Sequence, residues 1–230
     1  MIELNFAAVL QGEYLQWMVR GAVLTIALFG LSLVSAFALA VLLLVLRSLP
    51  WRLFDWLVAG YVNYHRNVPA LVHLIVWYFG VPQLLPDTVN AWINDRNGEF
   101  IFAWIALSLN AAAYMTEDLR SGLRSVATGQ MEAARSLGLS YAQAMRDVLM
   151  PQAIRVAVPA LINQALNLFK TTSLAMAIGV AEMTYASRQI ENETYRTFET
   201  FALASAFYLL ASFAIMAIGW WYDRRGWTGR

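Results

Sequence analysis

Three charged side chains stand inside long apolar stretches of the sequence: Arg66, Glu117 and Lys170. A charge deep in hydrocarbon costs about 2.5–3.5 kcal/mol on insertion scales, so such residues usually face a cavity or a partner. The two cations could bind a carboxylate, and Glu117 could bind an ammonium group or neutralise either cation. The alternative is a set of structural ion pairs that hold helices together without touching a ligand.

Polar side chains accompany these charges on the same stretches. On the stretch that holds Lys170, four polar residues follow the i, i+4, i+7, i+8 spacing of one helix face. We expect a path for a polar solute, lined by Arg66, Asn110, Tyr114, Glu117, Asn163, Asn167, Lys170 and Thr171. Hydrogen bonds between helices, worth about 0.6 kcal/mol each, would explain the same polar stripe without a path.

A proline interrupts the stretch that holds Arg66. Pro69 lacks the amide hydrogen that would bond to the His65 carbonyl, so a helix breaks here. Freed backbone groups at membrane depth are tolerated where they line a cavity or find another partner. Pro69 therefore favours a cavity beside Arg66. His73 lies on the same helix face as Arg66, and we assign it no role.

The sequence lacks the residues and motifs that nucleotide hydrolysis, metal binding and common hydrolases need. Lys170 is the only lysine and follows Phe169, so no phosphate-binding GxxxxGK[ST] loop exists. There is no cysteine, only two histidines, and neither an HExxH nor a GxSxG pattern. We expect no catalytic residue, no metal site and no cofactor in this chain. A membrane-embedded enzyme is disfavoured, and any ATP would be hydrolysed by another subunit.

The composition is that of an integral membrane protein. The 230 residues are 60% hydrophobic and 13% charged, with a net charge of +1. Soluble domains carry about 25% charged residues. This excludes a soluble globular domain, a disordered chain and a nucleic-acid binder, which would need a strong basic excess.

The apolar stretches predict an all-α protein with five transmembrane helices in one domain. A span needs about 20 mostly apolar residues. The expected spans cover residues 21–46, 53–80, 100–122, 152–181 and 198–222. Residues 1–20 are mildly polar and predict a short interfacial helix leading into the first span.

Arginines are concentrated in alternate links, which sets the orientation. They lie between the first two spans, between the third and fourth, and in the C-terminal tail, at Arg47, Arg52, Arg124, Arg135, Arg146, Arg224, Arg225 and Arg230. Basic links stay in the cytoplasm. We therefore expect the N-terminus outside, the C-terminus inside and residues 123–150 in the cytoplasm.

Residues 123–150 predict a helix–turn–helix outside the membrane. The first helix covers residues 130–135, and Gly138 is its C-cap. Ser140 is the N-cap of a second helix, residues 141–149, which is expected to stop before Pro151. The exposed apolar side chains would be Leu137, Leu139, Tyr141 and Met145. An amphipathic loop resting on the membrane surface is the alternative.

The same loop resembles the EAA motif of binding-protein-dependent ABC importer permeases. Glu132-Ala133-Ala134, three residues, Gly138, nine residues and Val148-Leu149-Met150-Pro151 repeat that motif's spacing. Residues 66–69 with 77–82, 113–122, and 167–174 with 178–183 resemble stretches of polar amino acid permeases. Thr171 stands where that family has an aspartate. Residues 66–69 and 82–86 are most similar to the glutamate/aspartate branch.

The resemblance implies a specific assembly. Type I importers of this kind have a five-helix core and pair as homo- or heterodimers in the bacterial cytoplasmic (inner) membrane. Two cytoplasmic ATPase subunits bind ATP and Mg, and a periplasmic or lipid-anchored binding protein delivers the amino acid. The EAA loop is the coupling helix that docks on the ATPase, which assigns this contact to Glu132, Ala133, Ala134 and Gly138. An ion-coupled secondary transporter or channel would explain the buried charges but not this loop.

Overall fold

The computed structural model describes residues 4–49 and 51–226, with side chains as far as residue 221. Every regular element in these residues is helical, which confirms the expected all-α class. Arg230 lies outside the described residues, as do the side chains of Arg224 and Arg225.

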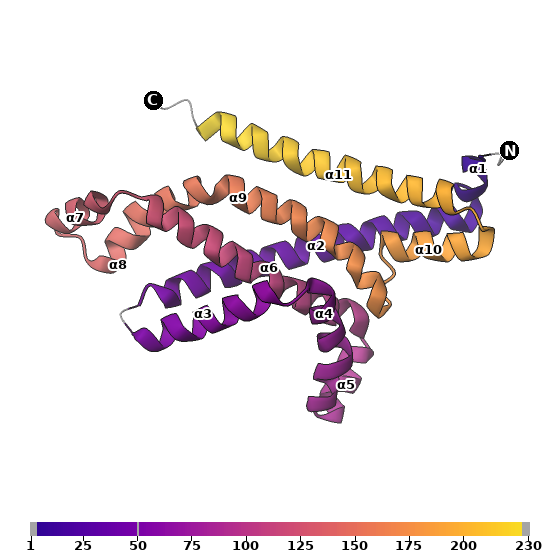
Figure 1. Cartoon of the computed structure of the whole chain (residues 1–230), viewed down its shortest axis with the longest axis horizontal. Helices are drawn as coiled ribbons and strands as arrows, with labels where there is room; N and C mark the ends of the chain where they lie inside the picture. Colours follow the sequence, from indigo (N-terminus) through magenta and orange to yellow (C-terminus); the bar gives the residue numbers. More distant parts are fainter. Residues whose placement is uncertain (1–3, 50, 227–230) are drawn as a thin grey trace.

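Four long helices run lengthwise through the molecule (Figure 1). They are α2 (Gly12–Arg47), α6 (Gly98–Ser125), α9 (Met150–Thr171) and α11 (Thr197–Gly226). The central helix α6 packs against α2 on one side and α9 on the other, and α11 lies over α9 and α10 (Met183–Thr194). Helix α1 (Phe6–Val9) and the last described turns of α11 lie toward opposite ends of the long axis (Figure 1).

Small residues let these helices approach closely. Ala103, Ala106 and Ala112 of α6 are fully buried in the core that α6 forms with α2 and α9. A Cβ atom at Gly122 would overlap the Ala153 carbonyl oxygen, so glycine is required where α6 meets α9. Packing of small residues is the main force between helices in lipid, where no hydrophobic driving force remains.

Within residues 4–49 and 51–226, three helices are long and apolar enough to cross a membrane: α2, α6 and α11. Large apolar side chains cover the outer faces of α2 and α11, with Val34 70%, Leu210 69% and Ile218 68% exposed. Such continuous apolar surface is stable against lipid or another subunit, not against water. Helix α9 is about 33 Å long at 1.5 Å per residue, also enough for a bilayer, but it carries the polar stripe.

Residues 53–80, expected as one span, form separate helical segments. Helix α3 (Arg52–Asn67) ends where the backbone extends at Val68 and Pro69. The chain then turns through α4 (Ala70–Ile75), the π-helical η1 (Val76–Gly80), the 3₁₀ segment η2 (Val81–Leu84) and α5 (Asp87–Asn94). In Figure 1 this arm points away from α3. The proline causes the break, as its position predicts.

The fourth expected span, residues 152–181, also changes its helical geometry. Helix α9 ends at Thr171 and continues as a 3₁₀ segment, η4 (Thr172–Ile178). Gly179 closes η4 with φ +92°, a conformation that suits glycine.

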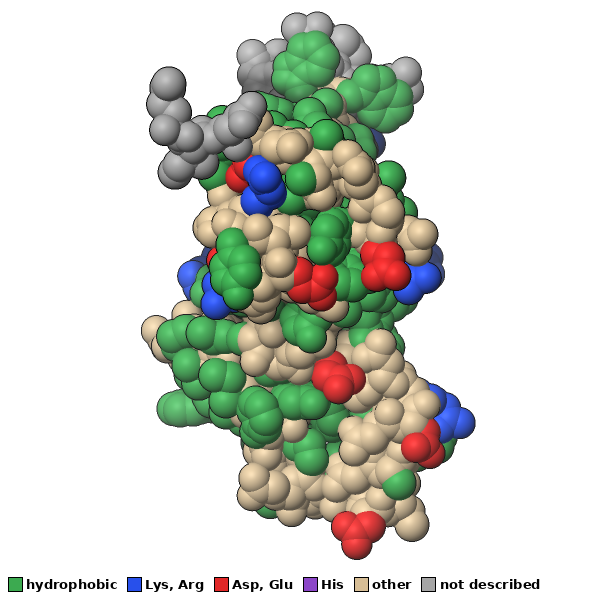
Figure 2. Space-filling model, turned by 90° about the vertical axis from the view of Figure 1, so that its right-hand side faces the viewer, with side chains coloured by type: hydrophobic (Ala, Val, Ile, Leu, Met, Phe, Trp, Pro, Cys, Tyr) green, Lys and Arg blue, Asp and Glu red, His purple; other side chains and the backbone are tan. Residues whose placement is uncertain are grey.

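The expected interfacial helix over residues 1–20 is wrong in its extent. Only α1 (Phe6–Val9) is separate, and residues 12–20 are the first turns of α2. The cause is tertiary packing, since Met18 of this segment is buried against Met183 and Ile190 of α10. Figure 2 views this end of the molecule, where acidic side chains are scattered over the surface.

Candidate functional site: a polar path and a coupling segment

The break at Pro69 brings three of the predicted path residues together. The Asn110 side chain donates to the freed His65 carbonyl at 2.8 Å. The Tyr114 hydroxyl donates to the Arg66 carbonyl at 3.2 Å, and the Arg66 guanidinium carbon lies 5.4 Å from the centre of the Tyr114 ring. Arg66 is exposed and forms no ion pair within the part of the chain that the structure describes. It therefore presents a cation held over an aromatic face.

The predicted stripe on α9 forms a surface of its own. Asn163, Asn167 and Lys170 are exposed on this helix, and Thr171 is half-buried. The Thr171 hydroxyl donates to the Asn167 carbonyl at 2.7 Å, so this side chain bonds within its own helix. Among the described residues, no hydrogen bond or ion pair joins Lys170 to the Arg66 group. Within one chain these are two separate polar surfaces.

Glu117 forms ion pairs with Arg47 and Arg120, not with Arg66 or Lys170. Its carboxylate lies 2.6 Å from Arg47 Nη1 and 3.6 Å from Arg120 Nη1, and Arg47 Nε contacts Asp55 at 2.7 Å. Glu117 therefore pairs with neither Arg66 nor Lys170, the two cations that it could have neutralised, and forms the structural ion pairs given above as the alternative. Instead Glu117 helps to tie α2, α3 and α6 together where α2 ends.

The expected helix–turn–helix lies beyond one end of the long helices, to the left in Figure 1. We call residues 128–149 the coupling segment. Its first helix is α7 (Thr128–Ser136), and Gly138 follows with φ +85°. The amide of Leu139 donates to the Ala134 carbonyl at 3.2 Å, which closes a Schellman-type turn. This confirms the predicted first helix and its glycine C-cap.

Ser140 is the predicted N-cap of the second helix, and a complete capping box forms there. Its hydroxyl accepts from the Gln143 amide at 3.3 Å, while its amide donates to Gln143 Oε1 at 2.8 Å. The helix begins as α8 (Tyr141–Ala144). Two local signals therefore fix the turn between α7 and α8.

The expected end of this second helix before Pro151 is wrong. Helix α8 continues through the π-helical η3 (Met145–Leu149) directly into α9. A proline clashes with the carbonyl four residues earlier in an α-helix. The wider π turn relieves this clash, so the helix bends without ending.

The predicted ATPase contacts divide into exposed and buried residues. Glu132, Ala133 and Gly138 are exposed, whereas Ala134 is only 3% exposed and packs inside the coupling segment. Of the four expected apolar contacts, Leu137 and Tyr141 are exposed at 84% and 48%, and Leu139 and Met145 are half-buried. The outer surface thus presents the apolar Leu137 and Tyr141 and small residues beside charged side chains such as Glu132. At its edge, hydrogen bonds from Arg146 hold the pKa of Asp147 below its usual value.

Glu182 lies in residues 178–183, one of the stretches that resemble polar amino acid permeases. No role was assigned to it from the sequence, but the structure shows that it stabilises the fold. It is fully buried as the N-cap of α10 and accepts from the Thr184 and Tyr185 amides, both at 2.9 Å. The Tyr208 hydroxyl of α11 donates to it at 2.7 Å. An acidic residue directly before a polar helix was the available signal.

We expect Glu182→Ala to destabilise the protein by about 2–4 kcal/mol, because two amides and one hydroxyl lose their acceptor. Thermal unfolding of the purified complex measures this. Gln189→Ala is the matched control, since Gln189 is exposed on the same helix, forms no side-chain hydrogen bond with another described residue, and should leave the melting temperature unchanged. An equal effect of the two substitutions would contradict the role of Glu182 as a cap.

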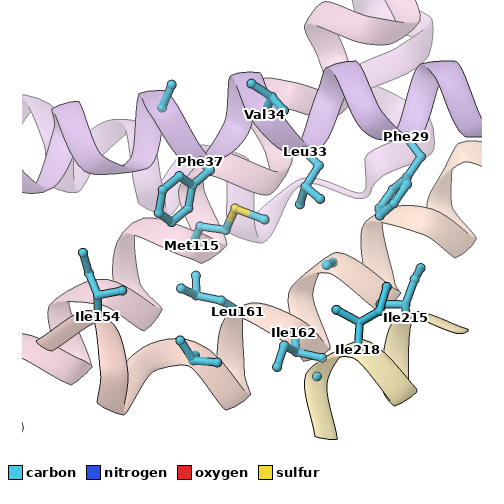
Figure 3. A pocket seen from close by; sticks show the side chains of 14 residues that line it. Phe29, Leu33, Val34, Phe37, Met115, Ile154, Leu161, Ile162, Ile215 and Ile218 are labelled. Carbon is cyan, nitrogen blue, oxygen red and sulfur yellow. The ribbon is translucent and has the colours of Figure 1, made fainter. Parts of the chain in front are cut away.

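One groove between the long helices has an apolar lining and is not a polar site. A groove of about 720 Å³ lies between α2, α6, α9 and α11, and its labelled lining in Figure 3 is wholly apolar, including Phe29, Phe37, Met115 and Ile162. A zwitterionic amino acid would lose its hydration there without gaining a partner. The polar path residues lie elsewhere.

Comparison with known proteins now decides the family. A family model described as "Binding-protein-dependent transport system inner membrane component" matches residues 36–226. The chain belongs to this family. It is therefore the inner-membrane component of a transport system of this type, as the EAA spacing indicated.

Named relatives are permeases for several amino acid-like solutes. The nopaline transport system permease protein NocM of Agrobacterium fabrum is 37% identical over 205 residues, with 86% of this chain and 85% of that protein covered. The glutamate/aspartate import permease protein GltJ of Escherichia coli is 33% identical over 209 residues, with 89% and 85% covered.

Solved structures agree with the fold. A crystal structure of an amino acid ABC transporter with histidines matches with a TM-score of 0.84 and 28% identity, over 97% of this chain and 100% of that one. The MetNI methionine ABC transporter in an inward-facing form matches with a TM-score of 0.70 at 20% identity, which supports the fold alone.

Proposed function

We propose that this chain is the permease subunit of an ATP-driven importer for polar amino acids, with glutamate and aspartate as the favoured substrates. The observation that carries the proposal is the coupling segment, whose two helices are joined by a capped turn beyond the long helices, with Leu137 and Tyr141 exposed beside small and charged residues. A partner subunit can approach such a surface closely. Two cytoplasmic ATPase subunits that bind ATP and Mg are the partners it suits.

An ion-coupled secondary transporter or channel is the second candidate. It would use the same exposed cations but has no need for an ordered, capped segment outside the membrane. Family membership and the coupling segment both favour the ATP-driven importer.

The full assembly would contain a second permease subunit, identical or different, and a periplasmic or lipid-anchored binding protein. The exposed polar stripe of α9 and the exposed Arg66 support this, because both surfaces are left open in a single chain. Charged groups at membrane depth are stable only against a partner or a water-filled path. We therefore place the path between two permease subunits.

The path would offer a solute both cations and hydrogen-bonding groups. Arg66 and Lys170 offer positive charges to carboxylates, with Asn110, Tyr114, Asn163, Asn167 and Thr171 as hydrogen-bonding neighbours. For the ammonium group we propose Asp118, which is half-buried on α6 within electrostatic reach of Arg66. Glu117 would first have to leave Arg47, so its part in the path stays a prediction.

The substrate preference has a direct test. Uptake of radiolabelled glutamate into proteoliposomes that hold the whole complex and its binding protein is measured with unlabelled competitors. We expect glutamate and aspartate to compete, and arginine and glutamine to compete far less. Competition by arginine alone would overturn the acidic assignment while leaving the importer intact.

The proposed topology has five spans, with the N-terminus outside and the C-terminus inside a bacterial cytoplasmic membrane. The chain has no cysteine, so single cysteines report accessibility without background. We expect Asn192→Cys, on the exposed end of α10, to react with an impermeant thiol reagent added to intact cells. Thr128→Cys, on α7, should react only after the membrane is opened. Rapid labelling of position 128 in intact cells would invert the topology.

A further inference from the structure

A small basic pocket opens where α2 and α6 end. Its volume is about 140 Å³, and it is lined by Leu44, Arg47, Ser48, Arg120, Leu123 and Arg124. Leu44 of α2 is buried in the helix core and Leu123 of α6 is half-buried, and both helices are long and apolar enough to cross a membrane. The pocket therefore combines apolar side chains with three guanidinium groups where two helices that could span a membrane end.

The charges around this pocket do not cancel. Arg47 is fixed by Asp55 at 2.7 Å and by Glu117 at 2.6 Å, and Arg120 lies 3.6 Å from the same Glu117 oxygen. Arg124 is exposed and makes no ion pair with any described residue. The three arginines carry three positive charges, and Asp55 and Glu117 carry two negative charges. One positive charge is left over, which a monovalent anion bound in the pocket would neutralise.

We propose that this pocket binds the phosphodiester headgroup of an anionic membrane phospholipid. A phosphodiester carries the single negative charge that the cluster lacks, and arginine binds phosphate oxygens with two parallel hydrogen bonds. Basic pockets at the ends of transmembrane helices are known sites for such headgroups.

The pocket also borders the coupling segment. The Tyr141 hydroxyl of α8 donates to the carbonyl of Ser48 at 3.4 Å, and Ser48 lines the pocket. A bound headgroup would thus support the end of α2 against which α8 rests. This makes the lipid a structural neighbour of the surface proposed to dock on the ATPase.

The test uses the whole complex in nanodiscs made of equal parts phosphatidylcholine and phosphatidylglycerol. Native mass spectrometry counts the phosphatidylglycerol molecules that remain after release. We expect retention by the wild type and at least about tenfold weaker retention by a double variant, Arg120→Gln with Arg124→Gln. Arg188→Gln, at an exposed arginine paired with Glu191, is the control and should retain lipid as the wild type does.

Two outcomes would overturn the proposal. Equal lipid retention by the wild type and the double variant, at equal assembly, would remove the site. Release of the lipid by inorganic phosphate, with phosphate bound in its place, would assign the pocket to a soluble anion instead. Arg124→Lys should keep most of the lipid binding because the positive charge remains. This variant therefore distinguishes a loss of lipid binding from a loss of folding.

Discussion

Replacing Gly138 by aspartate is expected to reduce uptake and substrate-stimulated ATP hydrolysis by at least about tenfold, with normal amounts of protein in the membrane. Gly138 has φ +85°, and an L-residue in this region costs about 1–2 kcal/mol. The larger effect comes from a charge at the tip of the coupling segment, where a docked partner would bury it without a counter-ion. Apart from its two chain neighbours, no described residue has an atom within 4 Å of a Cβ added at Gly138, so the chain itself should fold.

Two further substitutions at the same position separate charge from strain. Gly138→Asn has the same shape as aspartate without the charge, and asparagine tolerates a positive φ. Gly138→Ala adds the backbone strain alone. We expect Asn to keep most of the activity and Ala to show a moderate loss. Normal transport by Gly138→Asp would remove the coupling role of this turn.

Arg66→Ala and Lys170→Ala are each expected to lower uptake by at least about tenfold without loss of the assembled complex. Charge-assisted hydrogen bonds to a substrate carboxylate contribute about 1.5–3 kcal/mol, which corresponds to this factor. Neither cation is ion-paired within the described residues, so its removal leaves no carboxylate without its ion-pair partner. Uptake is measured beside the membrane abundance of the complex.

Arg96→Ala is the matched control for Arg66. Arg96 also stacks on an aromatic ring, with its guanidinium carbon 4.4 Å from the centre of the Trp92 ring, but it lies in the link after α5. Loss of a cation–π contact alone would affect the two variants alike, whereas a substrate contact affects only Arg66. Wild-type uptake by both Arg66→Ala and Lys170→Ala would leave these residues without a role in the path. Lost assembly would point to a structural role instead.

Local signals explain what the sequence could predict. Gly138 and Ser140 fix the turn of the coupling segment through backbone geometry and a capping box, both of which act within a few residues. Pro69 breaks its helix because of its own ring. The apolar stretches were likewise sufficient to locate the cores of α2, α6 and α11.

Contacts between distant residues could not be predicted in this way. Arg47 and Glu117 are 70 positions apart, and only the packing of α2 on α6 brings them together. The burial of Ala134 depends on how α7 folds back on α8, so its place in the EAA motif did not reveal whether it faces inward. Pro151 stays within a helix because a π turn precedes it, and no local pattern announces such a turn.

Whether transport by the purified complex requires ATP tests the central claim most directly. The complex is isolated through a tag on this chain, reconstituted into liposomes with its binding protein, and supplied with labelled glutamate. We predict that an ATP-binding subunit co-purifies, that uptake occurs only when ATP is present on the side of the coupling segment, and that ion gradients have no effect. Uptake driven by an ion gradient, by this chain without any ATPase, would contradict the account.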